Sequence, residues 1–302
     1  MTQTRIAHFS DTHVLSLKGV QIKALLNKRI TGAVNLAFNR AKHYRVEVFE
    51  ELLDAVVAIQ PDHSICTGDL VNLALAPEFE KVQSLLQQRF SGEELTLVPG
   101  NHDYYTKEAS LAGHFESSFA EYLPDDLQQQ SNETYPVTRL LKDVAIIGLS
   151  TAIPTPTFMA NGKVGSEQRQ RLQKVLQDDE VQSRFRLLML HHPLFREPKR
   201  RLEATRRLND AEDLIQLVDQ EAYAPHLIVH GHNHEYKRQA LPHTQCPVLQ
   251  VASASRAGKK RAEFHVYVIE DQKLISVERH IHDPDHHCFV PHDEQGNIIS
   301  AA

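Results

Sequence analysis

The sequence predicts an α/β domain in which a largely parallel sheet, or a pair of packed sheets, is covered by helices. Short apolar segments alternate with longer segments whose apolar residues recur at positions i, i+3 and i+4, the spacing of an amphipathic helix. Polar residues follow directly after the apolar segments, where strands are expected to end. Alternating strands and helices are typical of such folds. The 302 residues are enough to bury a core.

The expected strands follow one another with polar ends. The segments 5–10, 63–67, 95–98, 186–190 and 226–230 run into Asp-Thr-His, Gly-Asp, Pro-Gly-Asn-His-Asp, His-His-Pro and Gly-His-Asn-His, respectively. Further strands are expected at 144–149, 248–252, 264–270 and 274–280.

Three helices are expected, at 46–59, 77–90 and 166–176. Pro77 suits a first helical turn, where a missing N–H costs no hydrogen bond, and Ser166 suits an N-cap.

Composition excludes several classes of protein. The chain is mildly acidic (net charge −6), with 41% apolar and 24% charged residues, as in soluble globular proteins. Its three cysteines, Cys66, Cys246 and Cys288, are far apart and match no metal-binding spacing, which predicts reduced thiols and a cytoplasmic protein. No apolar run is long enough to cross a bilayer, and we expect no export signal. The 19 histidines make metal chemistry worth testing.

Two segments depart from this background. Residues 12–46 contain seven basic residues, no acidic residue and regularly spaced apolar residues, so they could form a lid over the site, an anchor on an anionic membrane or a packing element. A peripheral position at the inner face of the membrane is therefore the alternative location. After a domain that spans residues 1–282, we expect a His-rich tail at 283–302, extended or loosely packed.

The polar groups at the strand ends have the composition of a metal site. Carboxyl ends of parallel strands meet at one edge of a sheet, so these groups should converge. Oxygen and nitrogen donors without cysteine suit two divalent ions that share one carboxylate. Two such cations, roughly 3.5–4 Å apart, activate a bridging water and hold a phosphoryl group. The groups are Asp11, His13, Asp69, Asn101, His102, His191, His192, His232 and His234.

Five sequence blocks resemble the signature of the calcineurin-like metallophosphoesterase superfamily. They are Asp11-Thr12-His13, Gly68-Asp69, Gly100-Asn101-His102-Asp103, His191-His192-Pro193 and Gly231-His232-Asn233-His234. The resemblance implies a four-layer αββα sandwich of two mixed sheets, with two metal ions at the carboxyl ends of the strands.

The resemblance also assigns roles to residues. One metal would be held by Asp11, His13, Asp69 and His234, and the other by Asp69, Asn101, His191 and His232. His102 would be catalytic without binding metal, protonating the leaving oxygen or stabilising the developing charge. His192 would lie beside the ligands or the substrate. The ions could be manganese, iron or zinc.

The sequence says less about the substrate than about the metal ligands. We expect a phosphodiesterase for a small phosphodiester such as a cyclic nucleotide, partly because Asn72 matches some phosphodiesterases of the superfamily. Asn72 is also expected to bind the substrate. Arg206 and Arg207 could bind a substrate phosphate or lie on a solvated face. Tyr104 and Tyr105 could line the pocket or pack in the core.

Two other functions remain as alternatives. One is a pyrophosphohydrolase of a UDP-2,3-diacylglucosamine-type lipid at the membrane, suggested by the basic segment. The other is a non-catalytic interaction scaffold, which the intact ligand set argues against. Nucleic acid is not expected as a partner of an acidic chain.

Overall fold

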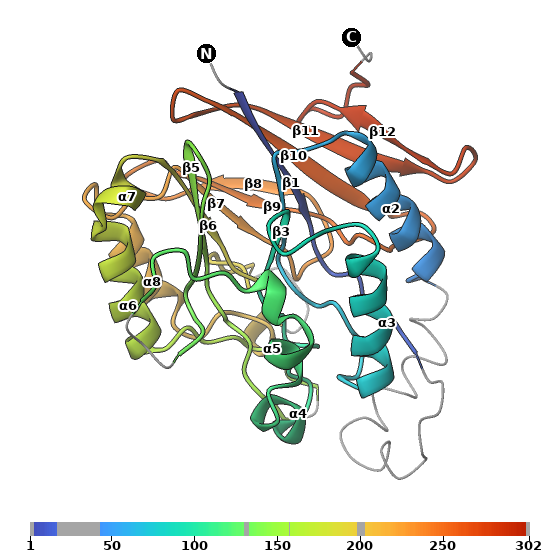
Figure 1. Cartoon of the computed structure of the whole chain (residues 1–302), viewed down its shortest axis with the longest axis horizontal. Coiled ribbons are helices and arrows are strands. Elements are labelled where there is room, and N and C mark those ends of the chain that lie inside the picture. Colours follow the sequence, from blue (N-terminus) through green and yellow to red (C-terminus); the bar gives the residue numbers. More distant parts are fainter. Residues whose placement is uncertain (1–2, 17–42, 130–132, 157, 198–202, 300–302) are drawn as a thin grey trace.

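The computed structural model describes residues 3–16, 43–129, 133–156, 158–197 and 203–299 (Figure 1). Its first sheet has six strands in the order β12-β11-β10-β1-β2-β3. These strands are, in chain order, β1 (Gln3–Phe9), β2 (His63–Cys66), β3 (Leu95–Leu97), β10 (Glu263–Glu270), β11 (Lys273–Asp283) and β12 (Cys288–His292). Only β1, β2 and β3 pair in parallel; the other pairs are antiparallel.

The second sheet also has six strands, in the order β4-β5-β6-β7-β9-β8. They are β4 (Val137–Leu140), β5 (Val144–Gly148), β6 (Phe185–Met189), β7 (Leu227–His230), β8 (Lys237–Ala240) and β9 (Pro247–Gln250). The four strands β5, β6, β7 and β9 are parallel, and β4 and β8 run antiparallel at the edges.

Helices cover one outer face of each sheet, and the inner faces pack together (Figure 1). On the first sheet lie α2 (Val46–Ala58) and α3 (Ala76–Gln87), which bury an apolar layer that includes Phe49 and Phe79. On the second lie α6 (Ser166–Gln177) and α8 (Ala211–Val218). A third apolar layer, with Ile65 and Leu187, lies between the sheets. The predicted αββα sandwich of two mixed sheets is therefore confirmed.

The short helices α4 (Lys107–Leu111), α5 (His114–Ser118) and α7 (Asp179–Gln182) lie in connections. Turns of 3-10 helix occur at Ala120–Tyr122 and Glu203–Thr205.

Every strand and helix predicted above is present, with ends displaced by a few residues. Pro77 lies in the first turn of α3, as expected. The expected N-cap at Ser166 is wrong, because Ser166 is already helical and Gly165, with φ +82°, occupies the cap. The Asp210 carboxylate accepts the N–H groups of Val164 (3.0 Å) and Gly165 (2.8 Å) there instead.

The C-terminal segment 283–302 contains a strand. β12 pairs antiparallel with β11 and forms an edge of the first sheet. Glu51 on α2 binds two histidines of this hairpin, with 2.7 Å to His282 Nε2 and 2.8 Å to His287 Nδ1. The hairpin is thereby held against α2.

The basic segment 12–46 is described only at its two ends, since residues 17–42 lie outside the described part of the chain. Its interpretation as a lid, an anchor or a packing element therefore stays a prediction. In the described ranges, no helix is long and apolar enough to cross a membrane.

Candidate metal centre

The candidate site lies where the parallel strands of both sheets end. Asp11 and His13 follow β1, Asp69 follows β2, and Asn101 and His102 follow β3 of the first sheet. The second sheet contributes two loops, with His191 and His192 after β6 and His232 and His234 after β7. The structure thus brings together all the groups that the sequence placed at the site, and nearly all are buried.

The loops that carry these groups have an unusual backbone. Asp11, His13, Asp69, His232 and His234 all have positive φ angles, between +45° and +75°. This left-handed conformation is costly for residues other than glycine. The loops also pack directly on the carboxylates, since a side chain at Gly231 would collide with Asp11 and one at Gly100 with Asp69. Residues that are strained and closely packed in this way are typical of functional sites.

Asp11, His13, Asp69 and His234 form a first cluster. His234 Nε2 lies 3.0 Å from Asp11 Oδ1 and 3.0 Å from His13 Nε2. His13 Nε2 is 3.8 Å from Asp11 Oδ1 and 3.9 Å from Asp69 Oδ2. The Tyr44 hydroxyl binds His234 Nδ1 at 2.7 Å, and this contact fixes the ring with Nε2 directed at the cluster.

A second cluster adjoins the first through Asp69. His191 Nε2 lies 3.4 Å from Asp69 Oδ2, the oxygen that also faces His13. His191 Nε2 is also 3.1 Å from His232 Nδ1. Since His191 Nδ1 lies 2.7 Å from the Thr67 carbonyl oxygen, it must donate its proton there, and Nε2 is the nitrogen that faces the site.

Buried polar atoms at the centre are suited to a cation. Asn101 Oδ1 and His232 Nε2 are buried and have no hydrogen-bond partner among the described residues. Buried polar atoms are rarely left in this state without an ion or water to satisfy them. The donor set of oxygen and nitrogen atoms without sulfur therefore fits divalent cations.

The charges of the site support the same conclusion. Burial alone would raise the pKa of Asp69, but the neighbouring His191, His102 and His13 lower it well below its usual value. Burial would lower the pKa of His191, but Asp69 raises it to about 9. Buried carboxylates here therefore require positive charge close by, which metal ions would supply.

His192 differs from its neighbour His191. Its Nε2 lies 3.1 Å from the Ala160 carbonyl oxygen and its Nδ1 lies 2.7 Å from the Thr151 hydroxyl. The carbonyl requires a proton on Nε2, so Nδ1 accepts from Thr151. Neither nitrogen has a lone pair left for a metal, although the ring is close enough to His191 and His232 to be a ligand.

His102 lies beside the first cluster. Its backbone N–H donates to Asp69 Oδ1 (2.7 Å), and its Nδ1 donates to the Asn72 carbonyl (2.7 Å). The ring stacks on Tyr105, with 5.4 Å between centroids, and meets His13 edge-on at 4.9 Å. Tyr105 therefore borders the site.

Asn72 connects two of these loops. It is buried, and its side-chain amide donates to the His13 carbonyl while its own carbonyl holds His102. Asn72 thereby holds the loops after β1 and β3 to the loop after β2, and its role in binding substrate stays a prediction. Tyr104 packs beside the core and its hydroxyl binds Glu116.

Asp103 and Tyr44 also belong to the site, although neither was predicted from the sequence. Asp103 Oδ1 accepts the N–H groups of Leu70 (2.9 Å) and Val71 (3.1 Å), and Oδ2 accepts those of Asp69 (2.9 Å) and Gly100 (2.8 Å). Asp103 thus fixes the loops after β2 and β3 to each other. Its place in the Gly-Asn-His-Asp block was the one available signal, while Tyr44 had none.

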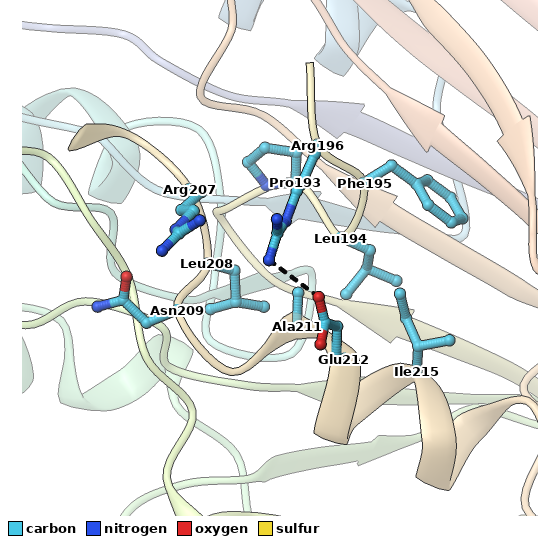
Figure 2. A pocket seen from close by; sticks show the side chains of 10 residues that line it. All are labelled: Pro193, Leu194, Phe195, Arg196, Arg207, Leu208, Asn209, Ala211, Glu212 and Ile215. Atoms are coloured by element: carbon cyan, nitrogen blue, oxygen red, sulfur yellow. Dashed lines mark hydrogen bonds and ion pairs between the residues drawn. The ribbon is translucent and has the colours of Figure 1, made fainter. Parts of the chain in front are cut away.

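A pocket of about 180 Å³ begins at Pro193, two residues after His191 in the chain (Figure 2). An ion pair of 2.9 Å between Arg196 and Glu212 joins its two sides. Arg207 borders it, and Arg207 Nε is buried without a hydrogen-bond partner among the described residues. Its lining residues are Pro193, Leu194, Phe195, Arg196, Arg207, Leu208, Asn209, Ala211, Glu212 and Ile215.

A smaller hollow connects this pocket with the metal loops. It shares Pro193, Phe195 and Arg207 with the pocket and extends to Arg206 and to Asn233, which lies between His232 and His234. Arg206 donates to the His232 carbonyl (3.3 Å), which places this arginine against the site.

Solved structures share the fold of this chain. A dimetal phosphatase from Danio rerio is 11% identical with a TM-score of 0.61, and the match covers 92% of this chain and 95% of that one. Protein TT1561 of Thermus thermophilus is 12% identical, with a TM-score of 0.52 and coverage of 92% and 98%. Purple acid phosphatase PPD1 from yellow lupin is 11% identical, with a TM-score of 0.60 and coverage of 98% and 55%.

Comparison of sequences gives the family. No curated protein matches the chain. Residues 4–236, which include all five sequence blocks, match the family model of the calcineurin-like phosphoesterases. Because that match spans most of the chain, the protein belongs to the calcineurin-like phosphoesterase family and is a metal-dependent phosphoester hydrolase.

Proposed function

We propose that this enzyme is a phosphodiesterase that hydrolyses a small phosphodiester, such as a cyclic nucleotide, at two divalent ions of manganese, iron or zinc. The observation that favours a diester is the pocket that begins at Pro193, two residues after His191. A monoester has one substituent, which leaves, whereas a diester has a second organic group that needs a place to bind.

The assignment of ligands follows the two clusters. Asp11, His13, Asp69 and His234 would hold one ion, and Asp69, Asn101, His191 and His232 the other. When bound, the ions would activate a water molecule and polarise the phosphoryl oxygens. Asp69 supplies the shared charge, because its Oδ2 faces histidines of both clusters.

His102 would assist the leaving group. Its Nδ1 is occupied by the Asn72 carbonyl, so Nε2 is the atom that can carry a proton to the leaving oxygen. Stacking on Tyr105 and contact with His13 fix the ring in this position.

The pocket suits a flat polar ring such as a nucleobase. Leu194, Leu208 and Ile215 offer apolar surface, and the Asn209 amide can donate to or accept from the edge of a base (Figure 2). A guanidinium such as that of Arg207 can stack on an aromatic face or bind an anionic group.

The test compares diesters with monoesters. For Arg207→Gln we expect KM for a cyclic nucleotide to rise about tenfold, the value of one charged hydrogen bond, while KM for nitrophenyl phosphate stays the same. Arg184→Gln is a control, because Arg184 binds Glu180 and the Leu141 carbonyl at the opposite end of β6. Faster hydrolysis of monoesters than of any small diester would contradict the proposal, as would equal effects of Arg207→Gln on both classes.

The lipid pyrophosphohydrolase alternative rests on residues 12–46, most of which lie outside the described chain. It stays a prediction, and binding to anionic vesicles is the measurement that tests it.

A further inference from the structure

A row of buried polar side chains crosses the apolar layer between the sheets, starting next to the metal centre. His8 on β1 lies opposite His265 on β10, and Tyr267 is on the same strand as His265. Thr67, directly after β2, lies at the end near the site, and Glu263 lies at the other end. All five side chains are almost fully buried.

Hydrogen bonds connect these five residues. His8 Nε2 lies 2.9 Å from Thr67 Oγ1, and His8 Nδ1 lies 2.7 Å from the Tyr267 hydroxyl. His265 Nδ1 lies 3.3 Å from the same hydroxyl, and His265 Nε2 lies 2.9 Å from Glu263 Oε1. Arg279 closes the row with bonds of 2.6 and 2.9 Å to the Glu263 carboxylate.

When both imidazole rings are neutral, the carboxylate sets the direction of every bond in the row. Glu263 can only accept, so His265 donates from Nε2, and in the neutral form of the ring the lone pair is on Nδ1. Tyr267 then donates to His265 and accepts from His8 Nδ1, and His8 Nε2 accepts from the Thr67 hydroxyl. Burial lowers the pKa of His8, and the neutral ring that results is the form this order requires.

The row ends at a residue that binds a proposed metal ligand. The Thr67 carbonyl accepts the proton of His191 Nδ1 at 2.7 Å, and the Thr67 N–H donates to the Phe9 carbonyl at 3.2 Å. Thr67 is also two residues before Asp69. An apolar set of side chains could fill this layer without any need for hydrogen bonds, so the polar row is not required for packing.

We propose that the row Thr67–His8–Tyr267–His265–Glu263 positions His191, by fixing the Thr67 carbonyl that orients the imidazole toward the metal centre. Its members are positioning residues, and the proposal rests on His191 being a metal ligand but on no particular substrate. Partners of this kind that orient a ligand typically change metal affinity or activity by about 10- to 100-fold when removed.

Tyr267→Phe tests the row with little change in shape. We expect affinity for one of two Mn²⁺ ions, measured by calorimetric titration of the metal-free protein, to fall about tenfold. We expect kcat to fall as well, with KM for a nitrophenyl ester unchanged. Tyr122→Phe is the matched control, since this buried hydroxyl binds the Phe90 carbonyl at 3.1 Å away from the site. It should leave Mn²⁺ affinity and kcat intact.

Thr67 provides a second test at the near end of the row. Thr67→Val removes the hydroxyl and should weaken Mn²⁺ binding as Tyr267→Phe does. Thr67→Ser keeps the hydroxyl and should bind Mn²⁺ with the affinity of the wild type. The double variant Thr67→Val with Tyr267→Phe should bind Mn²⁺ as tightly as Thr67→Val alone, because both substitutions interrupt the same row.

The proposal is overturned if Tyr267→Phe binds both ions like Tyr122→Phe, or if Thr67→Ser loses as much affinity as Thr67→Val. Since Mn²⁺ binding is measured without substrate, these outcomes are independent of whether the enzyme prefers diesters.

Discussion

Replacing Asp103 with asparagine removes one acceptor oxygen from a carboxylate that holds two loops. Each oxygen of Asp103 accepts two backbone N–H groups, from Leu70 and Val71 on one side and from Asp69 and Gly100 on the other. Burial raises the pKa of Asp103, but the four N–H groups favour the anion, because a proton on either oxygen would face two donors. The side-chain amide of the Asp103→Asn variant would create the same conflict permanently.

The expected cost follows from the number of bonds lost. The asparagine oxygen can replace one carboxylate oxygen, while its NH₂ group faces two N–H donors that lose their acceptor. Each buried donor left unsatisfied costs roughly 1–3 kcal/mol. A neutral amide is easier to bury than a charge, which offsets part of this loss, so we expect the free energy of unfolding to fall by about 2–4 kcal/mol.

The loops after β2 and β3 should also shift relative to each other. Asp69 and Asn101 lie in the segments that Asp103 connects, so Asp103→Asn should retain less metal. Urea denaturation measures the stability, and elemental analysis measures the metal content.

Asp219→Asn is the matched control. Its carboxylate accepts the N–H groups of His243 (2.9 Å) and Thr244 (2.8 Å) at the surface, where water can replace the lost acceptor. We expect Asp219→Asn to lower the free energy of unfolding by less than ~1 kcal/mol and to leave the metal content unchanged. If Asp103→Asn is as stable as this control and keeps its metal, the loops are held by other contacts and our reasoning is wrong.

Four further predictions test the site, the fold and the substrate. Asp69→Asn should lose metal and activity together, since no neutral side chain supplies the shared charge; two retained ions with normal turnover would show that Asp69 is not the shared ligand. His102→Ala should keep both ions and slow turnover by about 10²- to 10⁴-fold, with a smaller loss for nitrophenyl esters, whose leaving groups barely need a proton. Equal losses for all leaving groups would indicate a structural role. Burial would raise the pKa of Glu263, but hydrogen bonds and charge from His265 and Arg279 outweigh burial and lower this pKa from 4.5 to about 2. The Glu263 carboxylate should therefore add about 3 kcal/mol to the free energy of unfolding above pH 4.5, and this contribution should be lost as the pH falls toward 2. Thermal unfolding of wild type and Glu263→Gln should therefore converge in acid, and a gap that stays constant with pH would contradict this. Replacing four basic residues of the segment 12–46 with glutamine should raise KM for the true substrate but not for small activated esters. If the wild type co-sediments with anionic vesicles and this variant does not, the lipid substrate is supported. If the wild type does not co-sediment at low salt, the soluble diester is supported. These four are Lys28, Arg29, Arg40 and Lys42.

The elements that the sequence predicted are those whose signal is local. β1 and β2 are short apolar runs that end in polar residues, and α2 and α3 have regular apolar spacing. β8, by contrast, reads Lys-Arg-Gln-Ala and has no apolar pattern. It is a strand because β9, which follows it in the chain, offers an edge to pair with. β12 depends in the same way on β11.

The candidate site shows a similar division. The groups that the structure gathers at the strand ends belong to short blocks with recognisable spacing. Tyr44 and Thr67 take part through hydrogen bonds to His234 and His191, which are 190 and 124 residues further along the chain. Contacts over such separations depend on the packing of the two sheets, which neither composition nor spacing reveals.

The proposed metal centre would also join the two halves of the sandwich, because Asp69 from the first sheet faces His191 from the second. An ion held by both sheets binds the folded chain and not the unfolded one, so free metal raises stability by mass action. Each tenfold excess of ion over its Kd adds about 1.4 kcal/mol. In a cell, unfolded molecules are removed by proteases. The supply of metal should therefore set how long each enzyme molecule survives, as well as how fast it works.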